Sequence, residues 1–109
     1  MIKINYSNKA LKDLNEIKTY LSFDLQNEIV AIKTISKIYK RILLLENFLE
    51  IGSPVKFNSR FKTNFRYLIC DKYLIFYYIK NDNVCVVRVL HSKQNYLQKL
   101  FDFADDELN

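Results

Sequence analysis

The chain of 109 residues contains only one glycine, one proline, one histidine and two cysteines. A single histidine and two separated cysteines give no metal-ligand spacing, so we expect no zinc site and no cofactor. Cys70 and Cys85 lie inside apolar, strand-like runs. We expect them to be reduced core thiols, with a disulfide as the alternative. The sequence also has no glycine-rich phosphate loop, nucleophile elbow or pair of catalytic carboxylates.

Long apolar runs are absent as well. No stretch is long enough to span a bilayer, and the N-terminus lacks the pattern of a signal peptide. The predicted location is therefore cytoplasmic, with no membrane partner. Half of the residues are apolar, which is enough for a chain of this length to bury one core. With no repeat or linker, residues 1–109 are predicted to form a single domain.

The net charge of +5 is unevenly distributed along the chain. Residues 1–55 carry eight Lys or Arg against six Asp or Glu, whereas residues 56–99 carry nine basic residues against two acidic ones. Residues 100–109 contain four acids and no base. The basic region predicts an acidic partner, either nucleic acid or an acidic protein segment. Ordinary solvated lysines are the alternative.

The first half of the chain predicts a strand and two helices. Residues 2–6 alternate between apolar and polar, which is typical of a strand. Ser7 is a suitable N-cap for an amphipathic helix that runs to about Ser22. After a short connection, a second helix is predicted from about Gln26 to Phe48. The short connection makes these helices antiparallel neighbours.

The second predicted helix carries more apolar residues than one buried stripe needs. We expect one side of it to pack on the sheet and another on the first helix. Its main apolar stripe, at steps of three and four residues, consists of Ile32, Ile35, Ile38, Ile42, Leu45 and Leu49. The further apolar residues that widen this stripe are Ile29, Tyr39, Leu43 and Leu44.

The second half of the chain predicts an antiparallel meander. Gly52 and Pro54 end the second helix, and residues 55–64 form a basic loop. Strands are expected over Phe65–Cys70, Tyr73–Ile79 and Val84–His91, separated by Asp- and Asn-rich turns. Tyr96 to Phe101 has helical spacing and predicts a short terminal helix, and the acidic residues 102–109 are expected to fray.

The order of these elements predicts an α+β fold, β-α-α-β-β-β with a short C-terminal helix. We expect a two-layer sandwich, in which the helical hairpin covers one face of the sheet and the other face is open. The open face is where the basic residues of the meander would be displayed.

Two arginines of the meander are candidates for binding phosphate or an acidic partner. Arg88 lies in the middle of an apolar strand, where an unpaired guanidinium is costly to bury. It is therefore predicted either to pair with Asp71, Asp82 or a helix acid, or to have a functional role. Arg66 begins the first meander strand, and its guanidinium offers a planar fork to a phosphate. A surface arginine is the alternative.

Three polar residues lie close together after the last strand: His91, Lys93 and Tyr96. Together with Arg66 they suggest metal-independent RNA cleavage, in which one group removes the 2′-hydroxyl proton and another protonates the leaving oxygen. A hydrogen-bonded structural histidine is the alternative reading of His91. Phosphate binding would fall to the basic residues Lys56, Arg60, Lys62, Arg66 and Arg88.

Taken in order, several motifs resemble the RelE/ParE family of bacterial type II toxin–antitoxin toxins over nearly the whole chain. The motifs are Tyr6-Ser7 before Ala10-Leu11-Lys12-Asp13-Leu14, Ile51-Gly52-Ser53-Pro54, Phe65-Arg66-Tyr67-Leu68, Ile75-Phe76-Tyr77, Val86-Val87-Arg88-Val89-Leu90-His91, Gln94-Asn95-Tyr96 and Leu100-Phe101. The resemblance implies a small cytoplasmic α+β toxin that a cognate antitoxin neutralises in a hetero-oligomer.

The family has two activities. RelE-like members cleave mRNA on the ribosome, whereas ParE-like members block DNA gyrase. The Arg88–His91 run and the long helical hairpin resemble the ParE branch. The basic residues Lys56, Arg60 and Lys62 are more loosely spaced than in RelE-like enzymes, and the last segment has no arginine. We therefore favour a ParE-like gyrase inhibitor, with a RelE-like endoribonuclease and a non-toxic adaptor as alternatives.

Overall fold

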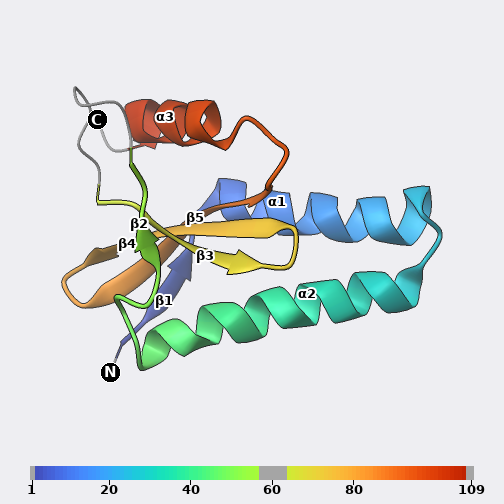
Figure 1. Ribbon diagram of the computed structural model, residues 1–109, viewed down its shortest axis with the longest axis horizontal. Coiled ribbons are helices and arrows are strands. Elements are labelled where there is room, and N and C mark those ends of the chain that lie inside the picture. The colour runs from blue at the N-terminus through green and yellow to red at the C-terminus, as the bar shows by residue number, and fades with distance from the viewer. Residues whose placement is uncertain (1, 57–63, 108–109) are drawn as a thin grey trace.

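The computed structural model of the protein describes residues 2–56 and 64–107, without the side chains of residues 101 and 103–107 (Figure 1). Arg60 and Lys62, two of the predicted phosphate-binding residues, lie outside this description. The elements in chain order are β1 (Ile4–Tyr6), α1 (Asn8–Thr19), a π-helical segment (Tyr20–Asp24), α2 (Glu28–Leu43), a 3₁₀ turn (Leu44–Glu46), β2 (Ser53–Pro54), β3 (Arg66–Cys70), β4 (Tyr73–Lys80), β5 (Asn83–His91) and α3 (Tyr96–Glu107).

The strands form one mixed five-stranded sheet in the order β1-β5-β4-β3-β2. The predicted meander is confirmed, because β3 pairs with β4 and β4 pairs with β5, both in antiparallel orientation. The N-terminal strand joins it at the edge, parallel to β5. Strand β2, which the sequence pattern did not predict, pairs Ser53 with Tyr67 and Pro54 with Arg66. Pro54 argues against a strand in the sequence, because proline occurs in sheets mainly on edge strands. Strand β2 is such an edge strand.

The turns of the meander explain the Asp and Asn residues between the strands. Asp71, Asn81 and Asp82 all have positive φ, at 53°, 53° and 60°. Asp and Asn tolerate this left-handed conformation better than other residues that carry a Cβ. Positive φ at both Asn81 and Asp82 is the requirement of a two-residue type I′ hairpin.

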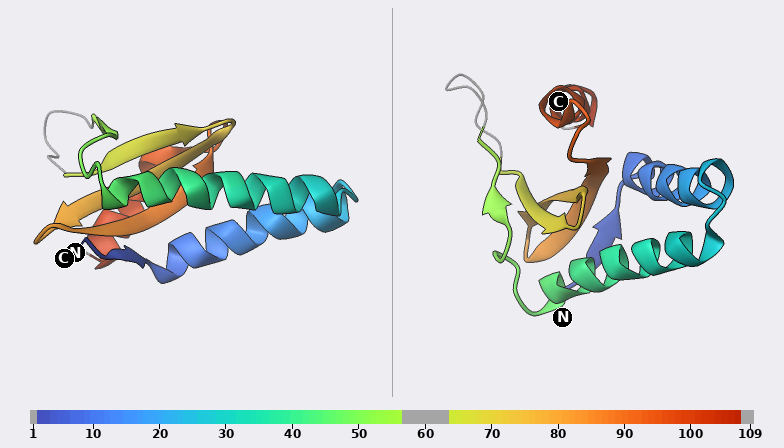
Figure 2. Two further views of the ribbon diagram at one scale, coloured as in Figure 1. Left: turned by 90° about the horizontal axis from the view of Figure 1, so that it is seen from below. Right: turned by 45° about the vertical axis from the view of Figure 1, so that its right-hand side comes forward.

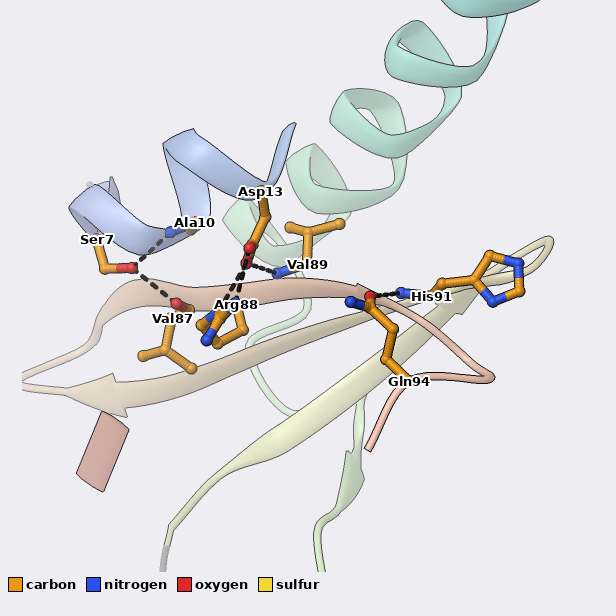
Figure 3. Close-up of polar contacts among 8 residues, drawn as sticks. All are labelled: Ser7, Ala10, Asp13, Val87, Arg88, Val89, His91 and Gln94. Atoms are coloured by element: carbon orange, nitrogen blue, oxygen red, sulfur yellow. Dashed lines mark hydrogen bonds and ion pairs between the residues drawn. The ribbon is translucent and has the colours of Figure 1, made fainter. Parts of the chain in front are cut away.

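Side-chain caps fix the starts of α1 and α2. Ser7 Oγ accepts the Ala10 N–H at 2.9 Å, as the sequence predicts, and the same hydroxyl donates to the Val87 carbonyl at 2.7 Å (Figure 3). The second bond ties the start of α1 to β5. Asn27 caps α2 by accepting the Val30 N–H at 3.2 Å.

The larger core lies between the α1–α2 hairpin and the sheet. Figure 2 shows both helices on the same side of the sheet. The fully buried residues come from both helices, from the 3₁₀ turn and from the inward face of every long strand. They include Ala10, Leu14, Ile38, Ile42, Leu45, Leu68, Ile75, Tyr77, Val84, Val86 and Val89.

The α+β fold is as predicted, but the opposite face of the sheet is not open, which corrects the expectation of an uncovered face. Helix α3 lies on this face (Figure 2), and Leu100 is fully buried against Phe65, Phe76, Val87 and Leu90. Residues 102–107 continue α3 to Glu107 instead of forming the expected frayed tail. A side-chain hydrogen bond of 3.0 Å from Gln98 to Asp102, one helical turn further on, supports this continuation.

Helix α2 buries only one of its two apolar stripes. Ala31, Ile38 and Ile42 are fully buried, but the residues expected to widen this stripe lie in solvent. Ile29 is 68 % exposed, and Ile32, which was predicted to belong to the main stripe, is 58 % exposed. Tyr39, Leu43 and Leu44 are also exposed. The prediction that a second side of α2 packs on α1 is therefore wrong for these residues. Apolar spacing alone does not distinguish a core stripe from an uncovered one.

The two cysteines lie on opposite faces of the sheet. Cys70 belongs to the core under the helical hairpin, and Cys85 packs in the cluster under α3. Strands β3 and β5, which carry them, are separated by β4. Both thiols are free, and burial raises the pKa of each. This geometry excludes the disulfide alternative.

In the part of the chain that the structure describes, no helix is long and apolar enough to cross a bilayer.

Buried tyrosines make the fold sensitive to high pH. Burial, with Tyr39 nearby, raises the pKa of Tyr6 to about 12, and burial also raises the pKa values of Tyr73, Tyr77 and Tyr78. The unfolded chain therefore loses these protons at a lower pH than the folded chain does. We expect the contribution of these tyrosines to the free energy of unfolding to be constant below about pH 9 and to fall as the pH rises from about 10 to 12.

Urea unfolding measured across this pH range tests the expectation. Tyr6→Phe removes one of the responsible groups, so the fall in stability should be shallower in this variant. An identical pH dependence in the variant and the wild-type protein would contradict the role of Tyr6.

Candidate functional site

Arg88, the arginine within the apolar β5 strand, pairs with Asp13 of α1. Its Nε lies 2.7 Å from Asp13 Oδ2 and its second guanidinium nitrogen lies 2.8 Å from Oδ1 (Figure 3). The two side chains are only 13 % and 7 % exposed. The Val89 N–H also donates to Asp13 Oδ2, at 2.9 Å. Arg88 thus has an acidic partner inside the molecule, the helix acid that the sequence left as one alternative.

A β-bulge places Arg88 where Asp13 can reach it. Phe76 pairs with Arg88, but the next residue of β4, Tyr77, pairs with Val86, so that Val87 is an extra residue in β5. The inward and outward alternation of the strand shifts at this point. Val84 and Val86 face the helical hairpin as alternation predicts, but Val89, not Leu90, continues that face. Strict alternation of faces along β5 therefore ends at residue 87. Bulges commonly redirect side chains in this way.

Arg66 holds the loop between α2 and β2. Its guanidinium donates to the carbonyl of Gly52 at 2.7 Å and to that of Glu50 at 3.3 Å. Tyr77, opposite Arg66 in the register, accepts the Gly52 N–H and donates to the Leu49 carbonyl, both at 2.9 Å. Both bonds come from one guanidinium nitrogen, Nη1, so Arg66, the candidate phosphate clamp, is anchored to backbone carbonyls through that nitrogen.

His91 and Lys93 lie in the turn that follows β5. The His91 N–H donates to Gln94 Oε1 at 2.7 Å (Figure 3), and His91 Nδ1 accepts the Lys93 N–H at 3.1 Å. The imidazole packs edge-on against Tyr73, with ring centroids 5.6 Å apart. These contacts match the hydrogen-bonded structural reading of His91. They leave Nε2 available to donate a proton, since Nδ1 is an acceptor.

Tyr96 lies on the other face of the sheet, at the start of α3. Its ring stacks on Phe76, with centroids 5.6 Å apart and an interplanar angle of 26°. Both rings line a groove of about 690 Å³ between α3 and the β2–β3–β4 edge of the sheet. Lys56 is the charged residue among the described lining residues of this groove. Its other lining residues are Ser53, Pro54, Val55, Tyr67, Ile69, Leu74 and Leu97.

The structure does not bring the candidate catalytic residues together. Arg66 is opposite Tyr77, and His91 is opposite Tyr73. Four residues of β4 therefore separate them along the strands, about 13 Å, and two strand spacings separate them across the sheet, about 10 Å. Tyr73, against which His91 packs, faces the helical hairpin, whereas Tyr96, the first residue of α3, packs in the cluster on the opposite face. The sheet itself thus separates Tyr96 from Arg66 and His91.

A second, smaller hollow of about 340 Å³ contains His91. Its charged lining residues are Asp13, Glu16, Arg88 and Lys99. Asp13 and Arg88 are paired with each other, so these two charges of the lining are already balanced. No three His, Cys, Asp or Glu side chains among the described residues are placed to hold a metal ion.

Three residues that organise this region were not among the predicted site residues: Asp13, Gly52 and Tyr77. Asp13 occupies a position that faces the buried side of α1, three residues after Ala10 and one before Leu14. A carboxylate on the buried face of a helix was the available signal, because it requires a partner. Gly52 and Tyr77 gave no such signal, since their contact joins residues 25 positions apart.

Comparison with known proteins identifies the family. Residues 4–96 match the family model described as "ParE toxin of type II toxin-antitoxin system, parDE". The match covers most of the chain, and the protein belongs to this family of toxins. The comparison with curated proteins gave no match.

Solved structures show the same fold at low sequence identity. The chain resembles a structure described as the chromosomal ParDE TA system from P. aeruginosa, with a TM-score of 0.70, 17% identity, and coverage of 84% of this chain and 96% of that chain. It also resembles YoeB-YefM complex from Staphylococcus aureus (TM-score 0.53, 21% identity, 84% and 97% covered). A third is YafQ from E. coli strain BL21(DE3) (TM-score 0.52, 17% identity, 89% and 98% covered).

Proposed function

We propose that this toxin of a type II toxin–antitoxin system acts in the cytoplasm by binding DNA gyrase, not by cleaving RNA. The observation that carries the proposal is the separation of Arg66, His91 and Tyr96. General acid–base catalysis requires its groups within hydrogen-bonding reach of one reacting phosphate. Here one group engages backbone carbonyls, one lies at the far end of the sheet, and one lies on the other face. The match to the ParE toxin family supports the same conclusion.

We also propose that an antitoxin, encoded beside this chain, binds and neutralises it. Two of the similar structures are described as a ParDE TA system and a YoeB-YefM complex. The basic balance of the chain, +5 overall, favours an acidic partner.

The alternative function, a RelE-like endoribonuclease, is favoured by one feature, the groove under α3. Aromatic rings such as Tyr67, Phe76 and Tyr96, with Lys56 beside them, suit the stacking and backbone contacts that proteins use to hold single-stranded RNA. The experiment below therefore includes both activities.

The test is expression of the toxin alone, followed by pulse labelling of DNA and protein synthesis, and a supercoiling assay with purified gyrase. We expect DNA synthesis to fall first, and supercoiling to be inhibited. His91→Gln and Tyr96→Phe should each retain inhibition to within about twofold, whereas loss of a catalytic acid or base would cost about 10²–10⁴-fold. An early loss of protein synthesis with cut mRNA, together with loss of toxicity in these two variants, would overturn the proposal in favour of the nuclease.

A further inference from the structure

The side of α2 that lies next to β3 carries a cluster of cations. Lys33, Lys37, Lys40 and Arg41 follow one another at steps of four, three and one residues. At about 3.6 residues per turn, these positions fall within about 100° of the helix surface, and no other residue between Lys33 and Arg41 does so. The three lysines are exposed and Arg41 is half-buried. These four residues are called the basic sector below.

The acids of this helix lie away from the basic sector. Glu28 is in the first turn of α2, and Glu46 is in the 3₁₀ turn that follows the helix. Glu28 precedes Lys33 by five residues, which places it close to the opposite side of the helix. Lys33 and Lys40 have no hydrogen-bond or ion-pair partner within residues 2–56 and 64–107. The fold therefore leaves positive charge on the sector.

Two contacts attach the basic sector to the edge of the sheet. Arg41 Nε donates to the Ile69 carbonyl at 3.2 Å, a bond that uses one of the five guanidinium donors. Lys37 Nζ lies 3.4 Å from Asp71 Oδ2, but the two side chains are 64 % and 60 % exposed, so this pair is weak. Lys72, the exposed neighbour of Asp71, adds another cation. In the left view of Figure 2, β3 lies on the side of α2 away from α1, so the sector and Lys72 form one basic surface there.

The spacing of these cations suits the phosphates of duplex DNA. From Lys33 to Arg41 the helix rises about 12 Å. Over that length, each strand of a DNA duplex carries about three or four phosphates. The charges of the sector and of the strand facing it are thus about equal in number. Contacts of this kind do not depend on the base sequence.

The side chains of the sector disfavour other acidic partners. Single-stranded nucleic acids are held largely by aromatic rings on which their bases stack, and the sector contains no aromatic residue. Protein–protein interfaces are depleted in lysine. Lysine and arginine are instead the residues that neutralise the phosphates of nucleic acids.

We propose that the basic sector of α2, with Lys72 beside it, is a contact surface for the phosphate backbone of duplex DNA, without preference for base sequence. The choice of DNA over an RNA duplex rests on the proposed function, because the DNA held by gyrase is then the duplex close to the toxin. Binding of a duplex to the toxin alone does not depend on that function.

Fluorescence anisotropy of a labelled DNA duplex of about 20 base pairs, titrated with the full-length protein, tests the surface. We expect a Kd of about 10⁻⁴–10⁻⁶ M near physiological salt, unchanged to within about twofold when the base sequence is shuffled. Between about 50 and 200 mM salt, the logarithm of the association constant should fall against the logarithm of the salt concentration with a slope of about −4, since four or five phosphates are neutralised. No binding, or binding that does not depend on salt, would overturn the proposal.

Two pairs of lysine substitutions locate the binding surface. Lys33→Gln combined with Lys40→Gln removes two charges of the sector, so the affinity should fall about tenfold or more and the salt slope should become shallower by about 2. Lys12→Gln combined with Lys18→Gln is the matched control, because both lysines are exposed on α1 and the net charge changes by the same amount. The control should bind as the wild-type protein does, and both variants should keep its melting temperature, since all four side chains are exposed. Equal losses of affinity in the two variants would show that the net charge, and not the sector, attracts DNA.

Competition against the bound DNA duplex identifies the class of partner. The competitors are an RNA duplex and a DNA single strand of the same sequence, and polyglutamate of matched charge. We expect each of them to displace the labelled duplex less well than unlabelled duplex DNA does. Better displacement by polyglutamate would overturn the proposal in favour of an acidic protein segment. Better displacement by the single strand or the RNA duplex would overturn the choice of duplex DNA.

A supercoiling assay separates this inference from the proposed function. The Lys33→Gln, Lys40→Gln variant should need a concentration about threefold or more above that of the wild-type protein to inhibit gyrase by half. Duplex binding by the wild-type protein without inhibition of gyrase would contradict the proposed function and still support the DNA surface. Inhibition of gyrase without duplex binding would contradict the DNA surface alone.

Discussion

Asp13→Ala is expected to lower the free energy of unfolding by about 3–5 kcal/mol, a large part of the stability of a domain of this size. The substitution leaves the Arg88 guanidinium, 13 % exposed, without its carboxylate. It also removes the acceptor of the Val89 N–H at the β-bulge. A buried charge and a buried donor are thus both left unsatisfied, and each has a desolvation cost. Urea unfolding followed by circular dichroism measures the loss.

A second variant keeps this prediction testable if Asp13→Ala does not fold. Asp13→Ala combined with Arg88→Met removes both charges, so most of the penalty should disappear and only the unpaired Val89 N–H should remain. Asp13→Asn should lie between the two, since its amide oxygen can still accept one of the bonds. Equal losses in the single and double variants would show that the pair contributes nothing beyond packing.

Gly52→Ala is expected to cost about 3 kcal/mol of unfolding free energy. A Cβ at this position would lie 2.6 Å from Tyr77 Oη, 2.7 Å from a ring carbon of Tyr77 and 2.8 Å from the Tyr67 carbonyl. The backbone carbonyl cannot move away cheaply, because Tyr67 is paired in β3. The Tyr77 ring is fully buried, so it has no space to withdraw. Displacement of the loop would also break its hydrogen bonds to Tyr77 and Arg66.

Thermal unfolding of Gly52→Ala beside Ser53→Ala tests this expectation. Ser53 is the exposed neighbour, and its substitution should change stability by no more than about 0.5 kcal/mol. Tyr77→Phe removes the hydroxyl and should cost about 1–2 kcal/mol. The double variant with Gly52→Ala should then lose less than the sum of the two single losses, because the same contact is removed twice. Additive losses would show that the contact with the Tyr77 hydroxyl is not the source of the strain in Gly52→Ala.

The loop at Gly52 also bears on the proposed function. Arg66 and Tyr77 fix the loop at Gly52 from which β2 and the groove residue Lys56 continue. If Arg66→Ala reduced toxicity, a parallel loss of stability would therefore be expected in a binding toxin. Loss of toxicity with unchanged stability would instead favour a catalytic role for the guanidinium.

The sequence alone determined most of the secondary structure. Ser7 and the spacing of Ala10, Leu14 and Ile17 identify α1, and the apolar runs broken at Asp71 and at Asn81-Asp82 identify the meander. These signals are local: caps, turn residues and periodicity act within a few positions of the chain. The order of the motifs was also sufficient for the resemblance to the RelE/ParE family, which the family match confirms.

Only the tertiary structure decided which polar residues meet. Asp13 and Arg88 are 75 positions apart, and the bulge that joins them shifts the face of β5 in a way that strict alternation cannot predict. The sequence likewise did not determine that α3 is buried on the second face of the sheet, or that Ile29 and Ile32 are exposed. Apolar spacing shows that a face is suited to burial, but what covers that face depends on contacts between distant segments, whose free energies no local pattern encodes.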